Sequence, residues 1–188
     1  ILTMLNLANL GFHSALVYTM YEAVANEDNA AICAMINFFR KVYRIIGFVI
    51  LGLGILVLPF LPKLVGDECP PGANVYVMFL LYLSATVMDY VLFGYVNAIF
   101  SAYQREDTRF KIMTVRYIFQ YVLQIVLLIA FKNFYIYLIT LPLMVIPNSV
   151  ANYYAAKREY PQIKCVGTPS KEIKKNVYAR VRTLFVHT

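Results

Sequence analysis

The chain has 188 residues, of which 61% are hydrophobic and only 14% are charged. This composition excludes an ordinary soluble domain, in which about a quarter of the residues are charged. The net charge of +7 would suggest a nucleic-acid partner in a soluble protein, but the positions of the basic residues favour another explanation.

The hydrophobic residues lie in five blocks, each close to the ~20 residues that a helix needs to cross a bilayer core. These blocks are residues 1–25, 45–65, 75–100, 111–131 and 135–156. The sequence therefore predicts an all-α fold, a polytopic helical membrane protein whose transmembrane lobe covers residues 1–156. The first block has no positively charged start and no cleavage site, so we expect a membrane helix within a longer protein rather than a signal peptide.

Basic residues concentrate in alternate connections. They are frequent at 26–44 and 101–110 and in the basic segment 157–188, whereas the other connections carry only Lys63 and Lys132. This is the positive-inside pattern, which places the basic connections and the C-terminal segment in the cytoplasm. It accounts for the net charge, so we expect membrane lipids and no nucleic acid as partners.

The three cysteines, Cys33, Cys69 and Cys165, lack the spacing of metal ligands. Only Cys69 falls on the predicted outer side of the membrane. We therefore expect no metal site and no disulfide within the chain.

Two ionisable side chains stand inside predicted spans. Asp89 lies about 21 Å along the helix axis from Val75, at ~1.5 Å per residue, which is near the middle of the membrane. A charge there costs roughly 2.5 to 3.5 kcal/mol on insertion scales, so such residues usually face a partner or a water-filled cavity. Arg116 begins about one and a half turns inside the next span. The alternatives are a structural bond for Asp89 and snorkelling to the headgroups for Arg116.

A polar stripe continues from Arg116. Gln120 and Gln124 follow it at i+4 and i+8, so all three side chains share one face of the fourth span. We expect this face to contact protein or water. We also expect the third and fourth spans to form a hairpin around which the fold is organised.

The first and last spans carry further polar groups. Asn6, Asn9 and His13 share one face of the first span, a pattern that more often joins helices than binds a ligand. His13 is also a candidate proton carrier, because an ordinary imidazole titrates in the physiological range.

In the last span, Pro142 and Pro147 each remove a backbone hydrogen bond, which predicts a kink or a local break. The freed carbonyls need polar partners, and Asn148, Ser149 and Asn152 follow directly.

Local signals define several connections. Asp28 or Asn29 is a suitable N-cap for a short amphipathic lead into the second span. Within that span, three glycines allow close helix approach. The turn at 132–134 is so short that the fourth and fifth spans must be antiparallel neighbours. After residue 156, an apolar stripe on a basic helix would suit the inner membrane surface. The glycines are Gly47, Gly52 and Gly54, and the stripe is Ile173, Val177 and Val181.

Five short patterns in the chain occur in an informative order. They are GFHSAL at 11–16, NFFRKVYRIIG at 37–47, AYQR at 102–105, KREYP at 157–161 after Asn148, and LFVH at 184–187. Together they resemble the polysaccharide-exporter and O-antigen flippase branch of the multidrug/oligosaccharidyl-lipid/polysaccharide exporter superfamily.

The resemblance implies a transporter with two six-helix lobes. This chain would supply about five helices of the N-terminal lobe, and its main partner would be the second lobe of the same full-length chain. The implied function is to flip a polyprenyl-pyrophosphate-linked oligosaccharide across the bacterial plasma membrane for cell-surface polysaccharide synthesis, with no catalytic residues, metal or cofactor. His13 and Asp89 stand where small or neutral residues are expected, so no family role is transferred to them.

On this hypothesis, basic and amide side chains line the path of the anionic headgroup, and two titratable side chains couple transport to an ion gradient. The predicted substrate-binding residues are Arg116, Gln120, Gln124, Asn148 and Asn152. The predicted ion-coupling residues are Asp89 and His13.

Three other functions are considered. A drug or cation antiporter of the same superfamily would need a more acidic cavity, and Asp89 is the one clearly intramembrane carboxylate in the sequence. A membrane-embedded polyprenyl-phosphate glycosyltransferase would need catalytic carboxylates or a metal cluster, whereas the acidic pairs at 27–28, 67–68 and 106–107 lack ligand spacing. A structural membrane subunit is the third alternative.

Overall fold

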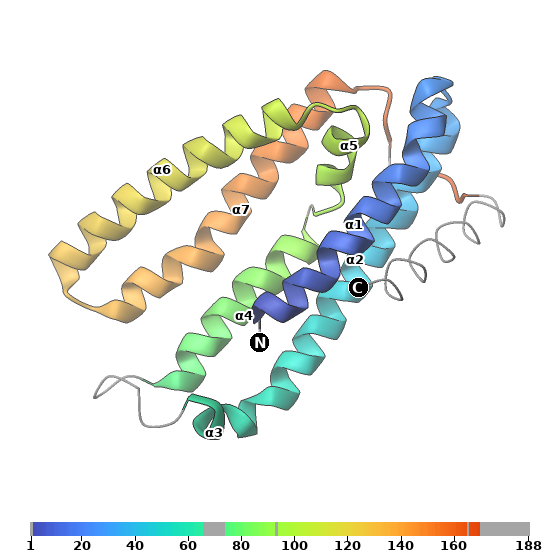
Figure 1. The fold of residues 1–188 in the computed structure, drawn as a ribbon. Coiled ribbons are helices and arrows are strands. Elements are labelled where there is room, and N and C mark those ends of the chain that lie inside the picture. The colour runs from blue at the N-terminus through green and yellow to red at the C-terminus, as the bar shows by residue number, and fades with distance from the viewer. Residues whose placement is uncertain (1, 66–73, 93, 165, 170–188) are drawn as a thin grey trace.

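The computed structural model describes residues 2–65, 74–92, 94–164 and 166–169, and all regular secondary structure in this part of the chain is helical (Figure 1). The side chains of Asn6 and Asn9, residue Cys69 and the predicted basic helix beyond residue 169 lie outside the described residues. The elements are α1 Leu2–Ala25, α2 Asn29–Val57, the 3-10 helix η1 Leu58–Phe60, α3 Leu61–Val65, α4 Val75–Val91, α5 Val96–Ala102, α6 Glu106–Phe131 and α7 Phe134–Glu159.

Three described segments are long and apolar enough to cross a membrane: Asn29–Lys63, Glu106–Phe131 and Phe134–Glu159. Helices α4 and α5 meet the same criterion only as a bent pair, which would make a fourth span. The chain is thus all-α, and its three to four candidate spans suggest a multi-pass membrane protein. The first predicted span does form α1, but α1 is not among the segments that meet the criterion.

The predicted span 75–100 is wrong as a single straight helix. Helix α4 ends at Val91 and α5 begins at Val96, and the two differ in direction by 58°. Gly94 lies in the break, where a Cβ would stand only 2.9 Å from the carbonyl oxygen of Asp89. The absence of a side chain at Gly94 therefore permits the close backbone approach at this corner.

Helix α2 merges the amphipathic lead with the predicted span 45–65, because it runs unbroken from Asn29 to Val57. The predicted cap is confirmed: the Ala31 amide donates to the Asp28 carboxylate at 3.0 Å. Beyond Val57 the chain continues as the 3-10 helix η1 and then as α3. Pro59 and Pro62 lie in these two elements and have no backbone N–H to donate.

Two of the three glycines of α2 provide a close approach to α4, as predicted. A Cβ at Gly47 would stand 2.7 Å from Val91 Cγ2, and one at Gly54 would stand 2.5 Å from Leu83 Cδ2. Gly52 differs, because a Cβ there would meet nothing within 4 Å. The α2–α4 contact therefore depends on Gly47 and Gly54.

Helices α6 and α7 are antiparallel neighbours, as the short turn predicts (Figure 1). Lys132 takes the left-handed conformation at φ 50°, and Asn133 caps α7 by accepting from the Tyr135 amide at 2.9 Å. Helix α7 remains continuous through Pro142 and Pro147, so the predicted local break does not occur.

The predicted hairpin of the third and fourth spans is wrong. Helix α7 packs against both α4 and α6 and lies between them (Figure 1), while α4 has α2 on its other side. The connection before α6 is also shorter than the predicted loop 101–110, because α6 already begins at Glu106. Glu106 and Asp107 in its first turn favour the helix N-terminus electrostatically.

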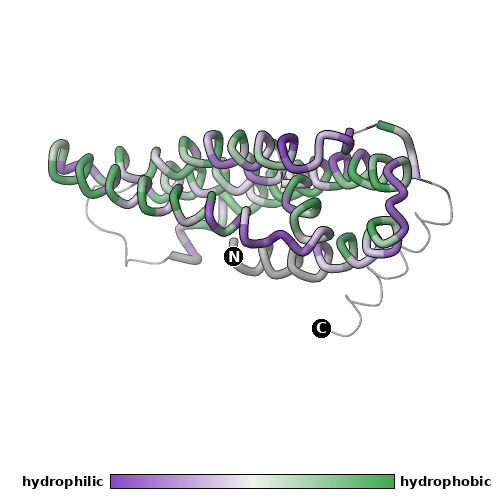
Figure 2. Tube along the Cα trace, turned by 90° about the horizontal axis from the view of Figure 1, so that it is seen from above, coloured by the Kyte–Doolittle hydropathy of each residue, from purple (hydrophilic) through white to green (hydrophobic). Residues whose placement is uncertain are grey.

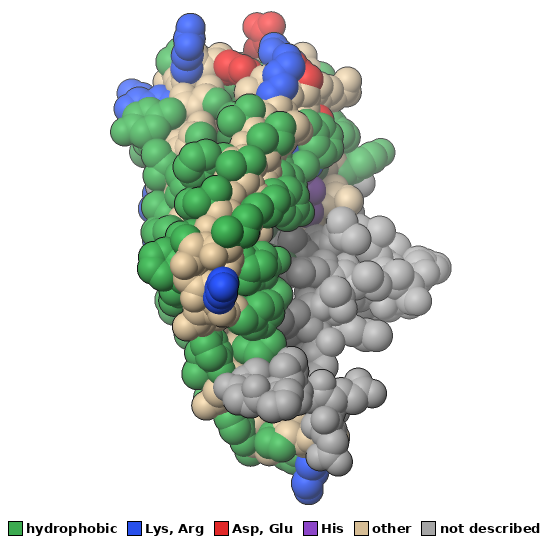
Figure 3. Space-filling view, turned by 90° about the vertical axis from the view of Figure 1, so that its left-hand side faces the viewer, with side chains coloured by type: hydrophobic (Ala, Val, Ile, Leu, Met, Phe, Trp, Pro, Cys, Tyr) green, Lys and Arg blue, Asp and Glu red, His purple; other side chains and the backbone are tan. Residues whose placement is uncertain are grey.

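The surface separates apolar and charged side chains along the molecule. Figure 2 shows apolar residues along the long helices, and Figure 3 shows acidic and basic side chains gathered at the end where α6 begins. The outward face of α6 is strongly apolar, with Ile129 71% exposed and Val115 68% exposed. Such a face is suited to lipid.

Candidate functional site

A polar cavity of about 480 Å³ lies between α1, α2, α4, α5 and the beginning of α6. We call it the His13 cavity, defined by His13, Tyr43, Asp89, Ser101, Glu106 and Arg109, all of which line it. The two side chains predicted to couple an ion, His13 and Asp89, therefore share one cavity although they come from different helices.

A chain of hydrogen bonds crosses the His13 cavity. His13 Nδ1 lies 2.7 Å from the Tyr43 hydroxyl, and His13 Nε2 lies 3.1 Å from Ser101 Oγ. Ser101 also contacts the Glu106 carboxylate, which in turn accepts from Arg109 Nε at 2.5 Å. The network thus joins α2, α1, α5 and α6 through five side chains.

The donors and acceptors of this network fix the His13 tautomer. The Ser101 hydroxyl has two acceptors, the Glu106 carboxylate and the Asn97 carbonyl oxygen at 3.1 Å, so it donates its one proton to one of them and accepts from His13 Nε2–H. Nδ1 is then the acceptor for the Tyr43 hydroxyl. A neutral imidazole therefore satisfies both of its partners, Tyr43 and Ser101, and a row of hydrogen-bonding groups leads from Tyr43 to Glu106.

Asp89 stands on the α4 wall of the His13 cavity, and its side chain is exposed. No ion pair joins it to Arg116 among the residues that the structure describes, although the guanidinium groups of Arg116 and Arg109 act on its charge electrostatically. The carboxylate therefore lines the cavity without an ion-pair partner among the described residues.

A second, mostly apolar groove of about 440 Å³ runs between α6 and α7. We call it the Arg116 groove, lined by Lys111, Ile112, Val115, Arg116, Phe119, Met144, Pro147, Asn148 and Ala151. Arg116 Nη1 donates to Gln120 Oε1 at 3.0 Å, and its guanidinium lies 4.0 Å from the centre of the Tyr117 ring. Arg116 Nε and Asn148 Oδ1 are buried without a hydrogen-bond partner in the described part of the chain.

The other predicted substrate residues are arranged differently. Gln120 holds Arg116, whereas Gln124 donates to Thr140 Oγ1 at 2.7 Å and is buried between α6 and α7. Asn152 donates to the carbonyl oxygen of Asn148 one turn earlier, at 3.0 Å. Neither Gln124 nor Asn152 lines the groove, so the polar stripe of α6 faces protein over much of its length.

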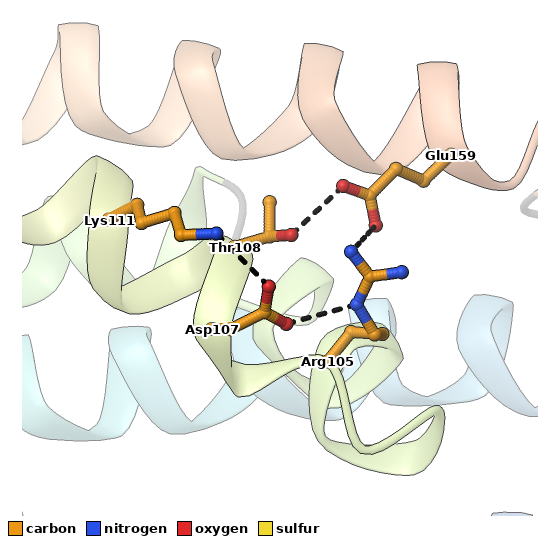
Figure 4. Close-up of polar contacts among 5 residues, drawn as sticks. All are labelled: Arg105, Asp107, Thr108, Lys111 and Glu159. Atoms are coloured by element: carbon orange, nitrogen blue, oxygen red, sulfur yellow. Dashed lines mark hydrogen bonds and ion pairs between the residues drawn. The ribbon is translucent and has the colours of Figure 1, made fainter.

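A third polar network, shown in Figure 4, joins the beginning of α6 to the end of α7. Thr108 donates to Glu159 at 2.9 Å, and Arg105 lies between Asp107, at 3.0 Å, and Glu159, at 4.0 Å. Lys111 pairs with Asp107 at 3.3 Å. The hydrogen bond to Asp107 raises the pKa of Arg105, so its charge persists at every physiological pH. These exposed pairs contribute little to stability individually.

Sequence reasoning missed Glu106, Arg109, Tyr43 and Ser101 as site residues. Glu106 and Arg109 were assigned to a loop, although an acidic pair followed by basic residues at i+3 and i+4 is typical of a first helical turn. Comparison of the chain with family models, curated proteins and solved structures gives no match.

Proposed function

We propose that the chain is part of a bacterial membrane transporter that flips a polyprenyl-pyrophosphate-linked oligosaccharide from the inner to the outer leaflet. The observation that best supports this function is the Arg116 groove, because it combines apolar walls with the cations Arg116 and Lys111. An amphiphile with a long apolar chain and an anionic headgroup matches both properties. The resemblance of the sequence patterns to the flippase branch points to the same substrate class.

Arg116 is suited to the headgroup. Gln120 engages one nitrogen of its guanidinium and holds the side chain, while Nε keeps a proton that no described residue accepts. A guanidinium binds phosphate oxygens through two parallel hydrogen bonds, which an ammonium cannot reproduce. The apolar walls would bind the polyprenyl chain, at ~0.8 kcal/mol for each buried methylene.

The His13 cavity would supply ion coupling. A proton that reaches the Tyr43–His13 pair can move along Ser101 to Glu106 by exchange of hydrogen-bond partners, and Asp89 offers a second acceptor.

One observation favours a second candidate, a cation or drug antiporter of the same superfamily. The cavity contains two carboxylates, Asp89 and Glu106, where the sequence alone suggested one.

The function is tested by substituting Arg116 in the full-length protein. Arg116→Ala should abolish export of the lipid-linked oligosaccharide without lowering membrane abundance, and Arg116→Lys should restore it partly because the bidentate contact is lost. Arg44→Ala is the matched control, since Arg44 is exposed and lines neither cavity. Normal export by Arg116→Ala at normal abundance would contradict the proposal.

A second arm of the same experiment separates the two candidates. Asp89→Asn should preserve folding and shift the dependence of oligosaccharide export on pH. If Asp89→Asn instead abolishes cation or drug efflux in cells while Arg116→Ala leaves efflux and export intact, the antiporter is the better assignment.

A further inference from the structure

A third pocket, of about 350 Å³, lies between α2, α5 and the end of α7, at the end of the bundle predicted to face the cytoplasm. We call it the Arg40 pocket. Its cations are Arg40, Lys157 and Lys164, and the rest of its lining is apolar or aromatic and includes Tyr160. It shares no residue with the two sites described above.

The wall that carries Lys164 is fixed to α2 by three hydrogen bonds. Cys33 Sγ accepts from the Lys164 amide at 3.1 Å and donates to the Gln162 carbonyl at 3.6 Å. Farther along, Asn37 donates to the Gly167 carbonyl at 2.7 Å. Because the segment that carries Lys164 is anchored to the helix that carries Arg40, these two cations are brought together before any ligand arrives.

The charge in the Arg40 pocket is one-sided. Within the described ranges no carboxylate lines it, and no ion pair engages Arg40, Lys157 or Lys164. The nearest acid in the sequence, Glu159, faces Thr108 and Arg105 instead. Arg40 Nε is buried and has no described hydrogen-bond acceptor, and leaving a buried donor unpaired is unfavourable. The pocket thus favours an anion that accepts hydrogen bonds.

Tyr160 adds a neutral donor to this lining. Its ring stacks on Tyr103 with 4.2 Å between centroids, which holds the side chain at the rim of the pocket. Burial, together with the neighbouring Glu159 carboxylate, raises the pKa of Tyr160, so the hydroxyl keeps its proton at neutral pH.

We propose that the Arg40 pocket binds the phosphate group of an anionic ligand at the cytoplasmic face of the membrane. One guanidinium and two ammonium groups around a cavity of this size match a phosphate or pyrophosphate group, to which charge-assisted hydrogen bonds are short and strong. The same chemistry is offered by a phospholipid headgroup and by a soluble phosphate compound. The site is independent of the proposed transport function.

The test uses the purified full chain in nanodiscs of neutral phosphatidylcholine. Calorimetric titration with inorganic pyrophosphate measures the soluble source, and native mass spectrometry of nanodiscs doped with phosphatidic acid measures the lipid source. We compare two pocket variants with one control. The pocket variants are Arg40→Gln and a double variant that carries both Lys157→Gln and Lys164→Gln, and the control is Lys41→Gln. Lys41 is the matched control, because it neighbours Arg40 and is exposed but does not line the pocket.

We expect each pocket variant to weaken binding by about tenfold or more, equivalent to ~1.4 kcal/mol, and Lys41→Gln to bind like the parent. If the pocket variants bind only pyrophosphate more weakly, the ligand is a soluble phosphate compound. If they bind only phosphatidic acid more weakly, the ligand is a lipid headgroup. An equal loss in Lys41→Gln would show unspecific attraction to a basic surface and overturn the proposal. Failure of the parent chain to bind either probe would overturn it as well. The double variant keeps the test decisive if Arg40→Gln does not fold.

Discussion

The His13 cavity and the Arg116 groove differ both in their polar groups and in the way they are assembled. In the cavity, the two partners of His13 lie 30 and 88 positions away along the chain. In the groove, Arg116 bonds Gln120 four positions away, and nearby Gln124 bonds Thr140 sixteen positions away on the next helix. The cavity therefore exists only when five helices are docked, whereas the groove needs little more than the α6–α7 hairpin.

The largest effect is expected from a substitution that separates α2 from α4. In Gly47→Ala, the new Cβ would stand 2.7 Å from Val91 Cγ2 and 3.2 Å from Tyr90 Cβ, so Val91 or the helix that carries it must shift. Overpacking of this kind typically costs about 1 to 3 kcal/mol of unfolding free energy. Unfolding by sodium dodecyl sulfate in mixed micelles measures the change.

Gly52→Ala on the same helix is the control for this prediction. Its Cβ meets nothing within 4 Å, so the variant should gain roughly 0.5 to 1 kcal/mol from the better helix propensity of alanine. If Gly47→Ala is as stable as Gly52→Ala, the close α2–α4 contact does not contribute to the free energy of unfolding of the helices that form the His13 cavity.

A smaller effect is expected on the groove side, from the buried pair Gln124 and Thr140. Thr140→Val keeps the side-chain shape but leaves the Gln124 amide without its partner, which should cost about 1 to 2 kcal/mol. Adding Gln124→Leu should recover part of this loss, because no buried amide then remains unpaired. A double-mutant cycle in the same micelles measures the coupling. Strictly additive effects would show that the two side chains do not interact.

The smallest effect is expected at the mouth of the groove. Lys111→Gln removes an exposed i,i+4 pair with Asp107, and such pairs contribute little in water. We expect no measurable change in thermal unfolding at either low or high salt. A clear loss of stability that disappears at high salt would instead assign the Figure 4 network a structural role in joining α6 to α7.

The contrast between the two sites also explains how much the sequence predicted. Local signals succeeded: the Asp28 cap, the turn at Lys132 and Asn133, and the close approach at Gly47 are all present. These features depend on residues near one another in the chain or on the absence of a side chain. Helical spacing alone also predicted that Arg116 and Gln120 share one face of α6.

The features that sequence reasoning missed depend on distant contacts. The bond from His13 to Ser101 follows only from the way α5 meets α1, and no spacing rule contains that information. The placement of α7 between α4 and α6 likewise separates the third and fourth predicted spans, which were expected to pair. The break at Gly94 was hidden because residues 75–100 are apolar throughout, and apolarity does not distinguish a straight span from a bent one.

The corner between α4 and α5 has a consequence for biogenesis. The insertion machinery selects segments by length and apolarity, and α5 alone, with 7 residues, covers only about 10 Å of membrane depth. Helices α4 and α5 qualify as a span only together. In the folded chain, however, α5 turns away by 58° and packs most extensively on α1. We therefore expect the corner to be completed by docking of α5 on α1 rather than by insertion of the segment.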